Sequence, residues 1–256
     1  MSMIAESSEN NNLYYHLIEG HSFLKVNAIA FTILCVFWSY FTTDIIEAWL
    51  SHIKIETGPN NPNLSIYSPF EWIMLRWEIV ILFSLVSIMP LSSILLYRFA
   101  KPGLYHRERG YLVSVLSMTT TLIPLLILTI WFYGIPYIFE YTKEFNSSIN
   151  VGEKYDAASI FSFGIGITWV LLVWAITLLT LSFSRIFGLV QDGNSRFRVR
   201  VVAISASLLI ITLPVEYDGL RLVISIGITV LADSFSKIIP VAMPQWTEHQ
   251  HSDTSV

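Results

Sequence analysis

The chain has 256 residues, of which 54% are hydrophobic and only 13% are charged. A soluble protein of this size could not bury so much apolar surface, and the formal net charge of -4 argues against a nucleic-acid partner. The single cysteine, Cys35, excludes a disulfide framework within the chain. Composition therefore indicates an integral membrane protein.

Four uncharged runs are long enough to cross a bilayer as helices. They extend over residues 26–43, 79–97, 111–139 and 157–184. Each reaches or exceeds the roughly 18 to 20 residues that span a hydrocarbon core. The first run follows a polar segment and lacks a small-residue cleavage pattern, so it is not interpreted as a cleaved signal peptide. All four are predicted to be transmembrane helices.

Two helix starts are predicted between the first and second runs. Asp44 and Glu47 have the spacing of a capping box and are followed by apolar residues at helical spacing, which predicts a short helix on the membrane surface. Farther along, Ser68, Pro69 and Glu71 supply a hydroxyl cap, a first-turn proline and a reciprocal glutamate. The second transmembrane helix is therefore predicted to begin near Pro69.

Two shorter uncharged runs follow near the C-terminal end. Residues 201–215 and 222–232 would form helices of about 16 to 22 Å, short of a core of roughly 30 Å. A re-entrant hairpin would also accommodate them. Pro214 and the charged turn at residues 216–218 favour a short transmembrane hairpin with its tip at the far interface.

These elements predict an all-α polytopic membrane protein with six transmembrane helices. One transmembrane domain is expected over residues 1–240, and a polar C-terminal tail over residues 241–256. The expected helices cover about residues 20–43, 69–98, 109–139, 157–185, 200–214 and 220–238. Ten lysines and arginines fall on the side that holds both termini, against five on the other. The positive-inside rule therefore places both termini in the cytoplasm, and the chain in the cytoplasmic membrane as a multi-pass protein.

Several tryptophans and ionisable residues lie in or near the predicted spans. The tryptophans at positions 38, 72, 77 and 131 are interpreted as residues of an interfacial aromatic belt. Arg76 and Glu78 lie near the outer interface and are interpreted as snorkelling side chains. Asp233 has Lys237 one helical turn later, and such a pair is as readily structural as functional.

The sequence contains no motif typical of an enzyme. There is no His-Glu-x-x-His zinc helix, no phosphate-binding glycine loop and no Gly-x-Ser-x-Gly nucleophile elbow. His249 and His251 lie in the polar tail and are interpreted as a solvated end rather than a metal site. The chain is therefore predicted to be neither an enzyme nor the carrier of a metal or cofactor.

Three segments resemble one known family. They are His-Leu-Ile-Glu at residues 16–19, Ser-Pro-Phe-Glu at 68–71, and Phe-Ala-Lys-Pro-Gly-Leu-Tyr-His-Arg-Glu-Arg at 99–109. They are similar to segments of TatC, the multi-spanning receptor of the twin-arginine protein translocase, and the third is the most specific. The resemblance extends from about Tyr14 to Ile239. It implies six helices in a concave, glove-like arrangement.

The resemblance also implies a site and partners. By position, Glu19 and Glu108 match the acidic signal-peptide site of the family, with Phe99 and Arg107 beside them. The structural residues carried over with the motifs are Ser68, Pro69, Glu71, Pro102, Tyr105 and Pro214. The implied partners are twin-arginine signal peptides of folded precursors, small single-span TatA/TatB-like subunits and the lipid bilayer. The resemblance does not fix the oligomeric state, and a homo-oligomer is among the states that it allows.

The chain departs from the family pattern at three places, one of which is near Trp49, where a proline common after the first span is replaced. Where the family continues as Glu-Leu-Arg-x-Arg-Leu, residues 19–24 contain no arginine, and residues 175–178 of the fourth span contain no acid. A small-solute secondary transporter or channel and a non-transporting membrane scaffold stay open as alternatives. The lack of internal repeats and of several buried charges opposes the transporter.

Overall fold

The computed structural model describes the backbone of residues 2–53, 57–58, 61–62, 64–65, 68–104, 106–149, 155–187 and 196–238. Within these ranges it does not describe the side chains of residues 2–19, 57–65, 106–107, 143, 145–149 and 155. The predicted tail after residue 240 lies outside the described residues.

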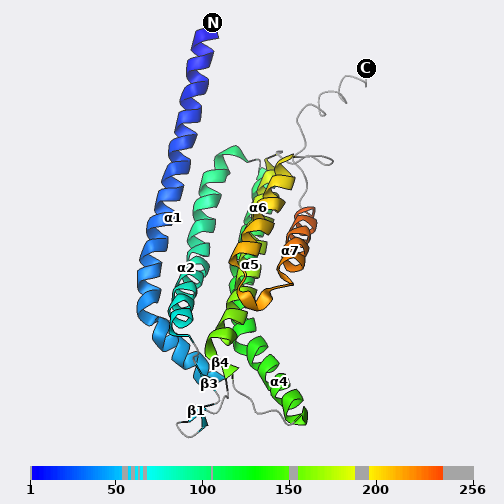
Figure 1. Ribbon diagram of the computed structural model, residues 1–256. Coiled ribbons are helices and arrows are strands. Elements are labelled where there is room, and N and C mark those ends of the chain that lie inside the picture. The colour runs from blue at the N-terminus through cyan, green and yellow to red at the C-terminus, as the bar shows by residue number, and fades with distance from the viewer. Residues whose placement is uncertain are drawn as a thin grey trace.

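The described chain crosses from one end of the bundle to the other six times (Figure 1). The elements are α1 (Ser2–His52), α2 (Pro69–Ala100), α3 (His106–Thr129), a π-helical segment η2 (Ile130–Gly134), α4 (Ile135–Ile149), α5 (Ala157–Ile186), α6 (Arg196–Thr212) and α7 (Arg221–Ser236). Short 3-10 turns, η1 (Lys101–Gly103) and η3 (Val215–Tyr217), follow α2 and α6. Four helical stretches are long and apolar enough to cross a membrane. The predicted all-α class is confirmed.

Four strands of two residues each lie between the helices. β1 (Thr57–Gly58) pairs antiparallel with β2 (Asn61–Pro62), and β3 (Leu64–Ser65) pairs parallel with β4 (Tyr155–Asp156). The second pair joins the segment before α2 to the segment before α5. Strands this short add only local links to a helical bundle.

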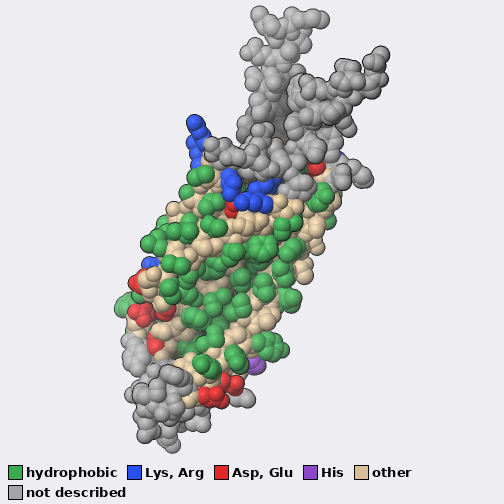
Figure 2. Space-filling view, turned by 90° about the vertical axis from the view of Figure 1, so that its right-hand side faces the viewer, with side chains coloured by type: hydrophobic (Ala, Val, Ile, Leu, Met, Phe, Trp, Pro, Cys, Tyr) green, Lys and Arg blue, Asp and Glu red, His purple; other side chains and the backbone are tan. Residues whose placement is uncertain are grey.

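The two ends of the bundle differ in charge. We call the end that holds η1 and the first turn of α6 the basic end, and the end that holds Ser68 and η3 the distal end. In Figure 2, most of the visible Lys and Arg side chains gather at the basic end. Most visible Asp and Glu side chains lie toward the distal end, and hydrophobic side chains cover the surface between. This distribution is typical of a protein that crosses a bilayer.

The segment after the first span is helical as predicted, but it is neither a separate helix nor placed with its apolar face on the membrane surface. α1 continues without a break through Asp44 to His52, and Figure 1 shows its last turns at an angle to the rest. The Thr42 hydroxyl donates to the Trp38 carbonyl oxygen at 2.5 Å near this bend, and such hydroxyl bonds within a helix favour bending. The apolar face that predicted a membrane contact packs into the bundle instead, with Trp49 only 5% exposed.

Helix α2 begins as predicted. Ser68 has an extended backbone, and its hydroxyl accepts the backbone N–H of Glu71 at 3.3 Å, while Pro69 occupies the first turn. This cap satisfies one of the free N–H groups of the helix end. Glu71 lies in the same first turn, where a negative charge is favoured by the helix dipole.

Helix α5 is the centre of the bundle. It packs against α2, α3, α6 and α7, and buried residues occur along its whole length. Asp156 caps its start by accepting the backbone N–H groups of Ala158 and Ser159. The central position explains why its apolar residues continue around the helix without a polar face.

The last two helices are short, as predicted. α6 has 17 residues and α7 has 16, which at the α-helical rise gives about 25 Å each. α6 begins at Arg196, earlier than the uncharged run 201–215 suggested, so three arginines, at positions 196, 198 and 200, lie in its first turns. Buried Ser205, Ser225 and Thr229 are small enough for the helices of this hairpin and α5 to pack closely. Pro214 lies between α6 and η3, at the distal tip of the hairpin.

Candidate functional site

A hydrophobic cluster fixes the turn between α2 and α3 at the basic end. It joins Ala100, Leu104, Leu112, Leu116 and Ile186, all buried. The turn itself is η1, which contains Pro102, and the backbone N–H of Lys101 bonds to the Tyr97 carbonyl. The turn therefore rests on the basic end of α5 through Ile186 rather than extending freely.

Glu108 lies on this anchored turn. It is in the first turn of α3 and is half-buried, and the helix N-terminus favours its negative charge. Beside it, the Arg109 guanidinium donates through Nε to the Leu104 carbonyl at 3.0 Å, which ties the start of α3 back to the turn. The start of α3, and with it the backbone of Glu108, is thus fixed at the basic end.

Phe99 connects this turn to the N-terminal part of the chain. Its ring lies 6.4 Å from the ring of Phe23 on α1, centroid to centroid, and Phe99 is 39% exposed. Position 19 lies one helical turn before Phe23 on the continuous helix α1. The contact therefore joins α1 to the end of α2 at the basic end. The side chains of Glu19, Tyr105 and Arg107 lie outside the described residues.

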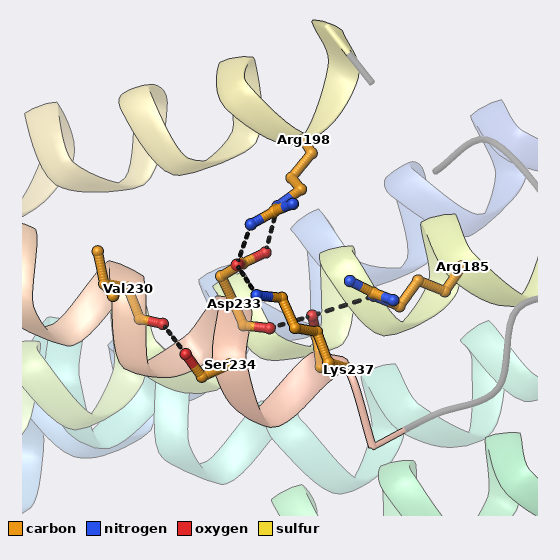
Figure 3. A network of polar contacts seen from close by, with 7 residues as sticks. Arg185, Arg198, Val230, Asp233, Ser234 and Lys237 are labelled. Carbon is orange, nitrogen blue, oxygen red and sulfur yellow. Dashed lines mark hydrogen bonds and ion pairs between the residues drawn. The ribbon is translucent and has the colours of Figure 1, made fainter. Parts of the chain in front are cut away.

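A network of charged side chains at the same end links α5, α6 and α7 (Figure 3). The Arg198 guanidinium donates to both carboxylate oxygens of Asp233, through Nε at 2.6 Å and through Nη2. Lys237 lies 3.5 Å from the same carboxylate. Buried Arg185 donates through Nε to the Ser236 hydroxyl at 3.3 Å. The network holds the short hairpin to α5, because each of the three helices contributes a side chain.

The sequence revealed only part of this network. The pair of Asp233 with Lys237 follows from helical spacing, and the structure contains it. The stronger partner, Arg198, lies on α6 and could not be paired from spacing alone. The one available signal was the group of three arginines at residues 196–200, which outnumbers the single nearby acid in the sequence, Asp192.

The distal end has an aromatic clasp between η3 and α5. The Tyr217 hydroxyl donates to the Phe163 carbonyl at 2.6 Å, and the two rings stack with centroids 5.8 Å apart. Gly166 makes room for the ring, since a Cβ there would lie 2.1 Å from Cε2 of Tyr217. Burial and the nearby Glu216 carboxylate raise the pKa of Tyr217 to about 12, so its hydroxyl stays protonated at neutral pH.

The indole groups of Trp38, Trp49 and Trp131 donate hydrogen bonds inside the bundle. The interpretation of Trp38 and Trp131 as membrane-belt residues is therefore corrected. The Trp38 indole donates to the Ser87 hydroxyl at 3.0 Å, and the Trp131 indole to the Thr168 hydroxyl at 2.9 Å. Trp49 donates to the carbonyl of residue 131 at 3.0 Å. Trp77 is 58% exposed, as expected for an interfacial ring. Sequence position alone did not show which face of each helix is internal.

The described side chains do not form a group of three or more potential metal ligands. The features at the basic end are instead a fixed carboxylate, an exposed aromatic ring and several basic residues. This arrangement suits contact with a charged and partly apolar polypeptide segment.

The fold and this end together define a multi-pass helical membrane protein. A family profile described as "TatC: Sec-independent protein translocase protein (TatC)" matches residues 15–225. The chain therefore belongs to the TatC family, which confirms the resemblance predicted from its motifs and makes it a component of the twin-arginine translocase.

Two solved structures share the fold, the "Crystal Structure of Twin Arginine Translocase Receptor- TatC" and the same receptor "in DDM". Each superposes with a TM-score of 0.60 at 20% sequence identity. The matches cover 88% of this chain and 99% and 100% of the two solved chains. No curated protein sequence shows significant similarity to the chain.

Proposed function

We propose that this TatC-family protein binds twin-arginine signal peptides of folded precursors at its basic end and mediates their transport across the cytoplasmic membrane. One observation carries the proposal: Phe23 of α1 contacts Phe99 at the end of α2, and the η1 turn that follows Phe99 leads to the start of α3, where Glu108 lies. Both segments are those that the family motif assigns to signal-peptide recognition.

The chemistry of the two acids fits a pair of arginines. A guanidinium group is planar and always charged, and it donates two parallel hydrogen bonds to a carboxylate. Two consecutive arginines therefore need two acceptors from separate segments, and Glu19 and Glu108 supply them. Exposed Phe99 offers an apolar contact beside the charged groups.

The proposed orientation places the basic end in the cytoplasm, as the positive-inside rule predicts. Precursors would then reach the site before they cross the membrane. Small single-span TatA/TatB-like subunits are the proposed partners, because the family acts as a component of a translocase. A homo-oligomer in the bilayer is a further partner to be tested.

Peptide binding to the purified protein in lipid nanodiscs tests the proposal. A twin-arginine signal peptide should bind more tightly than its Lys-Lys version, because lysine cannot form the bidentate pair. Glu108→Gln should weaken the arginine peptide roughly tenfold or more, since a charged hydrogen bond is worth about 1.5–3 kcal/mol. The matched control is Glu71→Gln, an exposed first-turn glutamate at the distal end. Equal binding of both peptides by the unaltered protein would refute receptor function.

The short hairpin supports a second part of the proposal. Helices of about 25 Å do not fill a core of roughly 30 Å, so the bilayer beside α6 and α7 must thin or be covered by protein. A thinned bilayer would suit the passage of folded cargo. Lengthening both helices by one apolar turn should reduce transport while leaving peptide binding intact. Unchanged transport by the lengthened protein would contradict this part.

A further inference from the structure

Two adjoining apolar cavities lie between α1, α2, α3, η2 and α5, away from the basic end. Their volumes are about 260 and 210 Å³. Both are bordered by Ile79, Phe83, Ile127, Leu128 and Trp131, so they form one continuous apolar region. Both exceed the roughly 150 Å³ of an apolar cavity that stays dry and accepts a small hydrocarbon.

The polar groups of the cavity walls are already satisfied within the protein. The indole N–H groups of Trp38, Trp49 and Trp131 donate to a serine hydroxyl, a backbone carbonyl and a threonine hydroxyl. The carbonyl that accepts from Trp49 belongs to the π-helical segment η2, where the usual helical hydrogen bond is displaced. The walls therefore present mainly carbon atoms, which excludes a site built for a polar solute.

The mouth of the cavities faces the membrane. Leu128 is 52% exposed and borders both cavities, and Phe132 is 44% exposed and borders the larger one. Both side chains lie in the helical stretch 108–142, which is long and apolar enough to span the bilayer. The medium in contact with this opening is therefore hydrocarbon rather than water.

The volume of the two cavities limits which chemical group can occupy them. The cavities, at about 260 and 210 Å³, are large enough to accept a hydrocarbon group. A single acyl chain is slender and flexible, and it can reach both adjoining cavities. An unfilled cavity would lose dispersion contacts along its whole lining. We propose that one acyl chain of a bilayer lipid enters past the exposed side chains of Leu128 and Phe132 and occupies this region.

Labelling with a phospholipid that carries a photoreactive diazirine in its acyl chain tests the proposal. The full-length protein is reconstituted in vesicles of phosphatidylcholine with a trace of this lipid, illuminated and mapped by mass spectrometry. Ile127 and Leu116 provide a matched comparison, because both lie on α3 and both are 5% exposed. Ile127 borders both cavities, whereas Leu116 packs in the cluster at the basic end.

The proposal predicts lipid adducts at Ile127, Ile79 and Phe161 and none at Leu116. Phe161 is a sensitive reporter because it is 1% exposed and borders the larger cavity. Ile127→Trp adds bulk at a wall shared by both cavities and should reduce the adduct at Phe161, while adducts at exposed Leu125 continue. Unlabelled cavity residues in the unaltered protein, or equal labelling of Ile127 and Leu116, would overturn it. A second test places photo-leucine at position 128. If it forms a dimer-sized adduct and no lipid adduct, the cavity is occupied by a second copy of this protein, and the lipid proposal is overturned.

Discussion

Gly166→Ala should destabilise the protein because it displaces the aromatic clasp of the distal end. The added Cβ would lie 2.1 Å from Cε2, 2.7 Å from Cζ and 2.9 Å from the hydroxyl oxygen of Tyr217. The ring must move, and movement breaks the 2.6 Å hydrogen bond to the Phe163 carbonyl and the stacking of the two rings. The tip of the α6–α7 hairpin would then lose its attachment to α5.

The expected cost follows from these contacts. Loss of the hydrogen bond costs about 1 kcal/mol, and loss of the ring pair about 0.5–1.5 kcal/mol. Overpacking adds about 1–3 kcal/mol if the backbone also moves, while alanine returns up to about 1 kcal/mol of helix propensity. The net expectation is a destabilisation of roughly 0.5–2.5 kcal/mol if only the ring moves, and up to about 5 kcal/mol if the backbone moves as well. Gly227→Ala is the control, since no atom lies within 4 Å of its Cβ position and only the propensity gain applies.

A double-mutant cycle separates the clash from other effects. The free energy of unfolding would be measured by titrating mixed micelles with sodium dodecyl sulfate. Tyr217→Ala removes the ring, so Gly166→Ala in that background should be neutral or slightly stabilising. If Gly166→Ala costs the same with and without the tyrosine ring, or leaves the unaltered protein as stable as before, the proposed clasp is refuted.

Two further predictions concern the ends of the hairpin. Asp233→Asn should lower the free energy of unfolding by about 2 kcal/mol. This is less than the roughly 3–5 kcal/mol expected for a fully buried pair, because the Arg198 side chain is 37% exposed. Lys237→Ala should change the free energy of unfolding by less than about 1 kcal/mol. Equal effects of the two variants would contradict the dominance of the Arg198 pair. Stability should also fall as the pH rises from about 10 to 12, because the Tyr217 pKa is raised to about 12 in the folded protein and the unfolded state therefore loses its proton first. Tyr217→Phe should lack this alkaline loss, and an unchanged pH profile in that variant would exclude Tyr217 as its source.

The long helices could be predicted because a bilayer imposes a minimum apolar length. Uncharged runs gave the number of crossings but underestimated several helices. α1 continues past Asp44, and α6 includes Arg198 and Arg200, because hydrogen-bonded helical backbone extends into polar residues wherever neighbouring helices or water accept the side chains. Charge marks where hydrocarbon ends rather than where a helix ends.

Short motifs carry the prediction of the candidate site. The segment at residues 99–109 contains Phe99 and Glu108, and the structure places them at the end of α2 and in the first turn of α3, on either side of η1. The clasp was not predictable, since Gly166 is one of several small residues in an apolar run and its partner Tyr217 lies on η3. Pairing of Arg198 with Asp233 was missed for the same reason: sequence spacing reports neighbours on one helix, while packing decides neighbours on different helices.

The convergence of positions 19 and 108 is the central claim, and one cross-linking experiment tests it directly. Cys35 is the only native cysteine, so Cys35→Ser provides a background for Glu19→Cys combined with Glu108→Cys. A short bifunctional maleimide should join the two cysteines in membranes, and Glu19→Cys with Glu71→Cys at the distal end should give no such product. Absence of the 19–108 product, with both cysteines accessible to a monofunctional maleimide, would contradict a shared site.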